Sequence, residues 1–318
     1  MLRLFTRYNT AARPGLSLRP LATQASPLGV DGSTENNLKT ETNRLAKTGE
    51  KFWEKVSLKD DGSQFLVQLD SKTVLTPLGN ALAVDKRRSL LAMLLKKEWT
   101  NLPSLAIKTH ALPLTSLVSR CIDLENVNKP DSDPEMRAKI GGDREHIAND
   151  LLRYLDTDTL LVFCPQAEFE GALRKAQDER YLPIIASVEK FLGQYSTSPI
   201  KLRVLDADVD GLRGNSQTNE TRKAAKKFLE SLSLWDLAIF EKTVLTTKSF
   251  ICGVLLLQNK ALDKSAEGLT STMESVAQAA TLEIIHQTDR WGEVEDTHDV
   301  DKRDVRRNIH AAGIVAYK

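Results

Sequence analysis

The 318-residue chain has few cysteines and lacks a long hydrophobic run. Its three cysteines, Cys121, Cys164 and Cys252, are far apart and lie in apolar surroundings, which predicts buried thiols and argues against a disulfide framework or a metal site. The most apolar segment, residues 249–258 (SFICGVLLLQ), has about half the length that a bilayer-spanning helix needs. It is therefore predicted to be a core helix, and no transmembrane segment is expected.

Motifs for several common chemistries are also missing. The sequence has no GxxxxGK[ST] phosphate loop, no GxGxxG after a strand pattern and no GxSxG element, and no cysteine has a histidine close to it in sequence. Lysine and arginine (44) nearly balance aspartate and glutamate (43), so the basic stripe of a nucleic-acid-binding protein is absent. We therefore expect no nucleotide cofactor, no nucleic-acid partner and no familiar type of active site.

Acidic residues and lysine are absent from residues 1–30, which contain four arginines among serine, threonine, alanine and leucine. This composition is typical of a mitochondrial presequence, whereas a secretory signal would need a continuous apolar core. A disordered basic tail is the alternative interpretation. We predict that residues 1–49 are a presequence and a flexible polar lead-in, that cleavage removes roughly the first 20 to 45 residues, and that the protein works in the mitochondrial matrix.

Residues 50–125 are predicted to form a small β-rich domain. Apolar residues alternate with polar ones around a DDGS turn at 60–63 and again before Pro77, which indicates an antiparallel meander. A helix starting near Asp85 is expected to cover the meander, since apolar residues occupy adjoining helical positions. These residues are Leu90, Leu91, Leu94, Leu95 and Trp99. Trp53 and Trp99 are predicted to be structural residues of the core.

The rest of the chain is predicted to be mostly helical. Residues 126–142 combine prolines and glycines with dense charge, which favours a charged loop or linker before an α-helical domain at 143–318. The expected elements are one or two helices in 172–191, a strand at 200–204, and helices at 219–232, 234–258, 267–290 and 301–312. The predicted fold class is therefore two-domain α+β.

The main candidate for a functional site is WGEVEDTHD, residues 291–299, after the predicted helix that contains Glu283. Leu269, Met273, Val276, Ala280 and Ile284 are expected to form a buried stripe that Trp291 extends, with Gly292 ending the helix. Three interpretations are open: a metal or acid-base site that uses His298, a solvated start of the next helix, or a charged docking surface. The docking surface is favoured, because neither an HExxH pairing nor a regular loop of oxygen ligands is present.

Several landmarks, taken in order, are similar to one protein family. They are FWEKVSL, TPLGNALAV, KKEW, LPLTSLVSR, LDTDTLL, an E-x-x-x-Q pattern and WGEVEDTHD, over about residues 50–312. This sequence resembles the F1-ATP synthase assembly factor 2 family, the chaperones of the F1 α subunit in mitochondria. The resemblance implies a non-enzymatic chaperone that binds the unassembled α subunit until the β subunit replaces it.

The resemblance also implies which residues bind the client. The family's functional glutamate and its WG-x-x-E-x-x-HD segment correspond to Glu283, Trp291, Gly292, Glu295, His298 and Asp299. Among these, Gly292 is expected to have a structural role and the other five to contact the partner. A matrix enzyme that uses the acidic and histidine block is the rival hypothesis, and stoichiometric binding without turnover would separate the two.

Overall fold

The chain divides into two units, Met1–Val30 and Asp31–Lys318. The computed structural model describes parts of the second unit only, and the predicted presequence lies outside them. The described residues are 51, 53–102, 111–141, 143–211, 214–260, 271–292 and 298–317. The side chains of residue 260 and of residues 298–301 lie outside the description.

A small antiparallel sheet opens the described part of the chain. Its strands are β1 (Val56–Asp60), β2 (Gln64–Leu69), β3 (Lys72–Thr73) and β4 (Ala83–Asp85). All of β1 pairs with β2, and the other edge of β2 pairs with β3 at one end and with β4 at the other. The β1–β2 connection is tight because Gly62 has a φ of 100°, a conformation that favours glycine. The predicted meander is therefore present.

Helix α3 (Ser89–Thr100) covers this sheet, as predicted, after the short 3-10 helix η1 (Lys86–Arg88). Trp99 is fully buried, with its ring centroid 5.5 Å from that of Trp53 in an edge-to-face contact, and its indole N–H donates to Thr115 Oγ1 over 2.9 Å. The structural role predicted for both tryptophans thus agrees with their burial. Leu90 was expected to face the sheet with the other apolar residues of this helix. That prediction is wrong, since Leu90 is 61% exposed.

Helix α4 (Pro113–Val127) joins the sheet layer to the helical part, since it packs against α3 on one side and against α10 and α14 on the other. Buried Asp123 accepts hydrogen bonds from Thr76 Oγ1 (2.5 Å), the Leu78 N–H (3.2 Å) and Asn80 Nδ2 (2.7 Å). The carboxylate thereby fixes the TPLGN turn, which contributes one of the sequence landmarks. α5 (Pro134–Lys139) lies within the segment predicted as a charged loop; the proposed domain boundaries stay a prediction.

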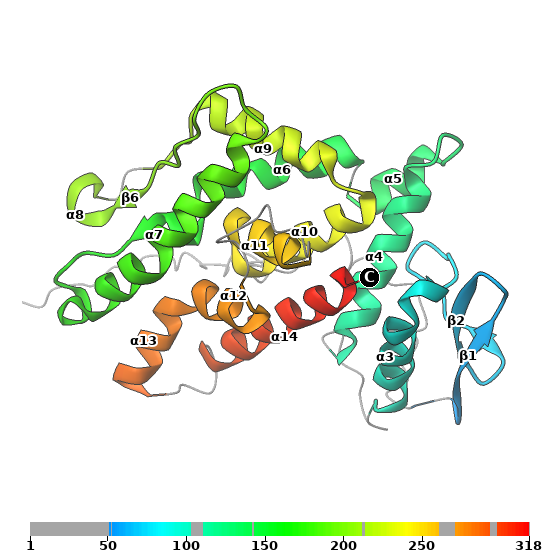
Figure 1. Cartoon of the computed structure of the whole chain (residues 1–318). Coiled ribbons are helices and arrows are strands. Elements are labelled where there is room, and N and C mark those ends of the chain that lie inside the picture. The colour runs from blue at the N-terminus through cyan, green and yellow to red at the C-terminus, as the bar shows by residue number, and fades with distance from the viewer. Residues whose placement is uncertain are drawn as a thin grey trace, which may run out of the picture. The chain divides into compact units, whose positions relative to one another are not determined.

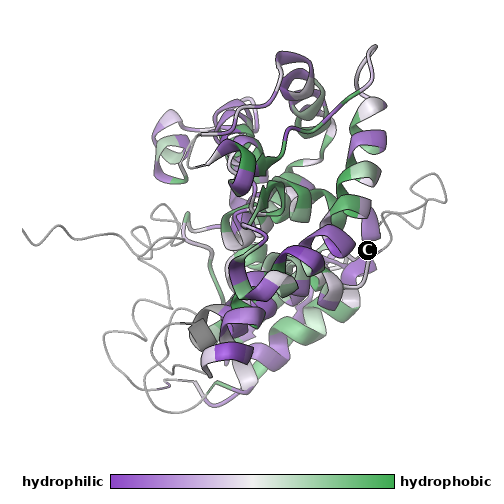
Figure 2. Ribbon diagram, turned by 90° about the vertical axis from the view of Figure 1, so that its left-hand side faces the viewer, coloured by the Kyte–Doolittle hydropathy of each residue, from purple (hydrophilic) through white to green (hydrophobic). Residues whose placement is uncertain are grey.

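The helical part is built around α10 and α11, with the other helices packed around them (Figure 1). Its long helices are α6 (Arg144–Asp156), α7 (Ala172–Gly193), α9 (Asn219–Ser231), α10 (Leu234–Thr247), α11 (Phe250–Lys260), α12 (Met273–Ala280), α13 (Leu282–Trp291) and α14 (His298–Ala316). The short elements are η3 (Thr159–Leu161), η4 (Glu168–Gly171) and α8 (Ala207–Asp210). Figure 2 shows hydrophobic residues gathered in the interior and hydrophilic residues outside. The predicted α+β class, with a strand-rich start and a helical remainder, is confirmed.

The apolar segment at 249–258 is a buried core helix, as predicted, but the expected single helix over 234–258 is wrong. Lys248 adopts a left-handed conformation with a φ of 57°, which ends α10. Ser249 Oγ then accepts the N–H of Cys252, and the buried carboxylate of Asp158 accepts the N–H of Ile251. These acceptors satisfy backbone groups at the start of α11, so the chain begins a second helix there. Across the described residues, no helix is long and apolar enough to span a membrane.

The strand predicted at 200–204 is also wrong. Only Leu205–Asp206 (β6) pair with another strand, Val162–Phe163 (β5), in a short parallel ladder. Side-chain amides bond the backbone beside this ladder. Gln217 Oε1 accepts the Arg203 N–H and its Nε2 donates to the Arg203 carbonyl, while Gln177 bonds the Cys164 N–H and the Val162 carbonyl in the same way.

Candidate functional site

Helix α13, which carries Glu283 and Trp291, is separate from α12. The prediction of one continuous helix over 267–290 is therefore wrong for the described residues, because the helix is interrupted at Thr281, which has non-helical backbone angles (φ −119°, ψ 20°). The Tyr181 hydroxyl of α7 donates to the Ala279 carbonyl over 3.0 Å. In a continuous helix that carbonyl would accept the N–H of Glu283. Because the Tyr181 hydroxyl occupies this acceptor, α12 ends and α13 begins as a separate helix whose axis runs in a different direction (Figure 1).

Trp291, at the end of α13, is 66% exposed. The sequence predicted that Trp291 extends a buried stripe, and this prediction is wrong. One neighbour supports it, since its ring centroid lies 5.3 Å from that of Phe169, which is only 8% exposed. The His286 ring lies 6.3 Å from the same phenylalanine. The exposed indole of Trp291 thus packs against a buried aromatic ring. Tryptophan is among the residues that contribute most to binding at protein interfaces.

The turn that carries Phe169 has an unusual backbone. Phe169, Glu170 and Gly171 all have positive φ angles of 48°, 56° and 82°. A left-handed conformation costs a non-glycine residue about 1–2 kcal/mol, so surrounding contacts must hold the first two. Arg290 supplies such contacts, because its guanidinium lies 5.6 Å above the Phe169 ring and 3.4 Å from the Glu170 carboxylate. α13 and the η4 turn therefore fix one another.

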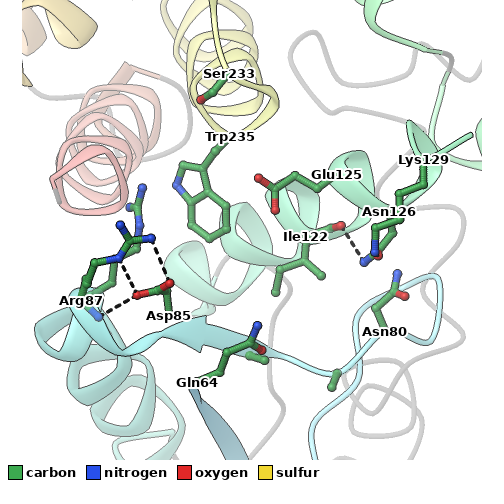
Figure 3. A pocket seen from close by; sticks show the side chains of 13 residues that line it. Gln64, Asn80, Asp85, Arg87, Ile122, Glu125, Asn126, Lys129, Ser233 and Trp235 are labelled. Atoms are coloured by element: carbon green, nitrogen blue, oxygen red, sulfur yellow. Dashed lines mark hydrogen bonds and ion pairs between the residues drawn. The ribbon is translucent and has the colours of Figure 1, made fainter. Parts of the chain in front are cut away.

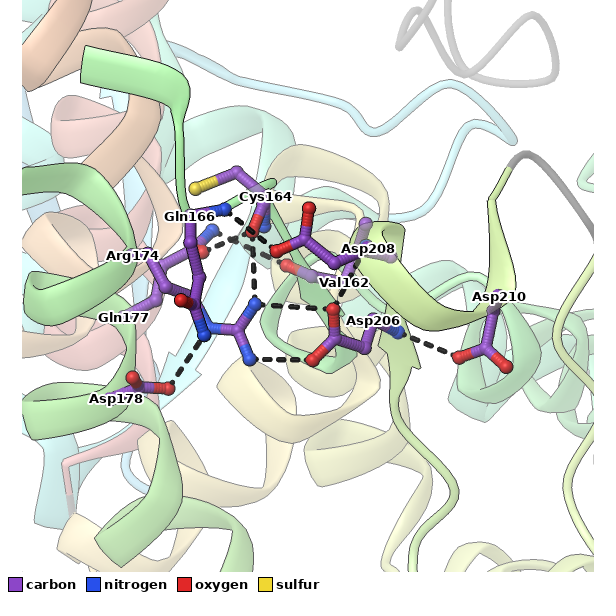
Figure 4. Close-up of polar contacts among 9 residues, drawn as sticks. All are labelled: Val162, Cys164, Gln166, Arg174, Gln177, Asp178, Asp206, Asp208 and Asp210. Atoms are coloured by element: carbon purple, nitrogen blue, oxygen red, sulfur yellow. Dashed lines mark hydrogen bonds and ion pairs between the residues drawn. The ribbon is translucent and has the colours of Figure 1, made fainter. Parts of the chain in front are cut away.

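A polar network secures the chain on both sides of this turn (Figure 4). Arg174 donates to Asp206 Oδ2 over 2.6 Å, to Asp178 Oδ1 over 3.2 Å and to the Cys164 carbonyl over 3.1 Å. The hydrogen bond from Arg174 holds the pKa of Asp206 below its usual value, against the smaller opposing effect of burial. Asp208 accepts the Gln166 N–H over 2.8 Å. β5, α7 and α8 are thus tied together just before and after η4.

The structure places two of the five predicted partner-binding residues. Glu283 lies in the first turn of α13, exposed, and accepts a hydrogen bond from Gln287 Nε2 over 2.9 Å. Trp291 lies in the last turn of the same helix. Glu295 lies outside the described residues, while His298 and Asp299 begin α14 with side chains that are not described. Gly292, with a φ of 80°, ends α13 as predicted.

Sequence reasoning missed the residues that surround Trp291. Phe169 and Glu170 lie far away along the chain, and the segment around them has no pattern that would pair it with α13. His286 and Arg290 lie within the predicted helix, but their importance follows only from the contact with the η4 turn. We call Phe169, Glu170, Glu283, Arg290 and Trp291, with His286, the α13 surface.

Thiol and metal chemistry find little support in the described part of the chain. Burial raises the pKa of the Cys252 thiol to about 12, that of Cys164 to about 11 and that of Cys121 well above its usual value. Such thiols stay protonated at neutral pH and are poor nucleophiles. Cys164 is only partly buried, contrary to the expectation of three buried thiols. No group of three metal-ligating side chains occurs among the described residues.

Solved structures of other proteins share this fold. A putative chaperone from Agrobacterium tumefaciens superimposes with a TM-score of 0.61 at 21% identity, covering 84% of this chain and 85% of that one. Atp12 from Paracoccus denitrificans superimposes with a TM-score of 0.55 at 20% identity, covering 84% of this chain and 99% of that one. At these identities the likeness establishes the fold alone.

Sequence relatives identify the family. The family model described as ATP12 chaperone protein matches residues 50–189. Protein ATP12, mitochondrial, from Saccharomyces cerevisiae is 61% identical over 298 residues, 92% of each chain. Protein atp12, mitochondrial, from Schizosaccharomyces pombe is 34% identical over 266 residues, 84% of this chain and 81% of that one. The chain belongs to the ATP12 family of chaperones, which confirms the resemblance and the chaperone function that it implied.

Proposed function

We propose that this chaperone binds the unassembled α subunit of the ATP synthase F1 sector in the mitochondrial matrix and releases it to the β subunit, without catalysing a reaction. Family membership supports a chaperone, and the names of both fungal relatives place those proteins in mitochondria. The basic, acid-free residues 1–30 support import. The observation that carries the proposal is the α13 surface, with the exposed Trp291 ring braced on Phe169.

The energy available at the α13 surface fits a reversible contact. A tryptophan buries roughly 150–250 Å², so covering the two-thirds of Trp291 that is exposed contributes about 3 kcal/mol at ~25 cal/mol per Å². Glu283, exposed on the same helix, adds a negative charge that favours a basic side chain on the client and sets the partner's orientation. Together with the predicted contacts of Glu295, His298 and Asp299, this gives specificity and still permits release.

The test compares Trp291→Ala and Glu283→Lys with Glu220→Lys. Glu220 is a matched control, because it is also an exposed glutamate in the first turn of a helix, α9. Suppression of α-subunit aggregation and affinity for the purified α subunit are measured beside the melting temperature. We expect both α13 variants to melt like wild type and to bind at least tenfold more weakly, with Glu220→Lys unchanged.

Two results would contradict the proposal. If Trp291→Ala and Glu283→Lys are folded and bind the α subunit like wild type, the α13 surface is not the client site. If the purified chain turns over a substrate at a rate that changes with His298 or Asp299, the rival enzyme hypothesis gains support over the chaperone acting alone.

A further inference from the structure

The direction of α13 depends on a gap in the backbone hydrogen bonds at its start. The Thr281 N–H donates to the Ala277 carbonyl over 3.1 Å, and the helical pattern resumes where the Ile285 N–H donates to the Thr281 carbonyl over 3.0 Å. Between these two bonds, no hydrogen bond among the described residues joins the N–H groups of residues 282–284 to the carbonyls of residues 278–280. Successive bonds of an α-helix are therefore missing, and the backbone turns there.

The Tyr181 hydroxyl of α7 occupies one of these free carbonyls. It donates to the Ala279 carbonyl over 3.0 Å, the acceptor that the Glu283 N–H uses in a continuous helix. The Tyr181 side chain is only 3% exposed, and burial raises the pKa of Tyr181 above its usual value, so the hydroxyl keeps its proton at neutral pH. A buried donor is costly to leave without an acceptor. The hydroxyl therefore competes with the helix for this carbonyl and favours the turn between α12 and α13.

Tyr181 is itself held in place by the elements around it. Its ring packs edge to face on Phe163 of β5, with the ring centroids 6.0 Å apart. One turn earlier on α7, Gln177 bonds the backbone of β5 and of the residue that follows it. Beside Tyr181, Arg180 donates to Gln278 Oε1 over 3.2 Å, which gives α7 a second contact with the end of α12. The hydroxyl is therefore a fixed point against which the end of α12 is placed.

The other end of α13 rests on the η4 turn, which directly precedes α7 in the chain. Phe169 of this turn lies 5.3 Å from the Trp291 ring, and Glu170 lies 3.4 Å from Arg290. α13 has 10 residues and is about 15 Å long, so a change of about 20° in its direction at the start moves its end by about 5 Å. A movement of that size would separate Trp291 from Phe169. The α13 surface therefore depends on the turn at the start of the helix.

We propose that Tyr181 is a positioning residue for client binding: its hydroxyl occupies the Ala279 carbonyl and thereby keeps α13 turned onto η4, so that the α13 surface exists as one unit. The inference rests on the proposed client site, but it adds a residue that the client does not touch, because Tyr181 is buried. Without the hydroxyl, the Glu283 N–H takes the free carbonyl, α12 and α13 merge into a straighter helix, and Trp291 moves away from Phe169.

The test is Tyr181→Phe, which removes the hydroxyl alone and keeps the ring on Phe163. The protein is labelled with ¹⁵N at its four tryptophans, and the indole signals are assigned with Trp235→Phe and Trp291→Phe. We expect Tyr181→Phe to move the Trp291 signal and to bind the purified α subunit at least fivefold more weakly. Trp235 is the internal reference, because it lines the cleft between the sheet layer and α4 (Figure 3) and its indole N–H donates to the Val315 carbonyl over 3.3 Å. Its signal should stay in place.

Thr243→Val is the matched control, because it also removes a buried hydroxyl that donates to a helix carbonyl, that of Ile239, over 2.8 Å. Whatever its effect on the melting temperature, it should leave the Trp291 signal and the affinity for the α subunit like wild type. An unmoved Trp291 signal in Tyr181→Phe overturns the proposal without reference to the client. A moved signal with wild-type affinity overturns it as well, provided that Trp291→Ala weakens binding. If Trp291→Ala also binds like wild type, the proposed client site fails and the positioning role fails with it.

Discussion

The buried ion pair between Arg120 and Glu241 gives the sharpest test of how the chaperone is held together. Arg120 of α4 donates to both carboxylate oxygens of Glu241 on α10, over 2.9 and 2.8 Å, and a third N–H of Arg120 donates to the Ile140 carbonyl. The two residues are only 7% and 9% exposed. The pair thus links the helix that carries the sheet layer to the centre of the helical part.

Arg120→Met should destabilise the protein strongly, because it leaves the Glu241 carboxylate buried without its cation. Breaking a buried pair from one side costs about 3–5 kcal/mol. For a protein of this size, such a loss lowers the melting temperature by about 6–20 °C. Glu241→Leu should cost a similar amount by leaving Arg120 unpaired.

The double variant Arg120→Met, Glu241→Leu should be much more stable than the sum of the single variants predicts, because it removes both charges. The Ile140 carbonyl still loses its donor, so a residual cost of about 1–3 kcal/mol is expected. Urea unfolding followed by circular dichroism at 222 nm measures all four proteins, with the slope checked for constancy. If the two single effects simply add, the side chains are not coupled and the reasoning is refuted.

Two further predictions concern the core of the helical part. Burial raises the pKa of Asp158 from 3.8 to about 6, against hydrogen bonds from the start of α11. The folded state therefore binds the Asp158 proton more tightly than the unfolded state, so the free energy of unfolding falls as pH rises from about 4 to 6. Urea unfolding at pH 4 and pH 7 should show that wild type loses about 2–3 kcal/mol between these pH values relative to Asp158→Asn. A parallel pH dependence of the two proteins would contradict this. Gly253→Ala would place a Cβ 2.6 Å from the buried Phe240 ring, whereas Gly313→Ala would meet only the flexible end of Met273 at 2.5 Å. Thermal melts should show a loss of about 1–3 kcal/mol for the first and a smaller loss for the second, and equal losses would refute the distinction.

Local patterns predicted the sheet layer, its covering helix and the helical character of the rest, because these depend on period-two and period-3.6 spacing. The break between α10 and α11 also had a local signal, since Ser249 stands three residues before Cys252 in the position of a helix cap. The break at Thr281 had no such signal. Its cause is the Tyr181 hydroxyl on the Ala279 carbonyl, a contact between residues 98 positions apart.

The candidate site was predictable only in part. The sequence placed Glu283 and Trp291 on one helix that ends at Gly292, and the structure agrees. It also assigned Trp291 to a buried stripe, because an apolar residue at helical spacing normally faces the core. The new direction of α13 after Thr281 and the strained turn at Phe169 leave that ring 66% exposed, and both result from long-range packing.

The glutamine amides beside β5 and β6 have a consequence for a protein that handles other unfolded chains. A two-stranded ladder with bare edges is a template on which foreign strands can add and aggregate. Gln177 bonds the N–H of Cys164 and the carbonyl of Val162, and Gln217 does the same for both groups of Arg203. Gln177 thus pairs with the β5 backbone as a one-residue strand would, and Gln217 does the same at Arg203, just before β6, so these backbone groups are not available to a foreign strand.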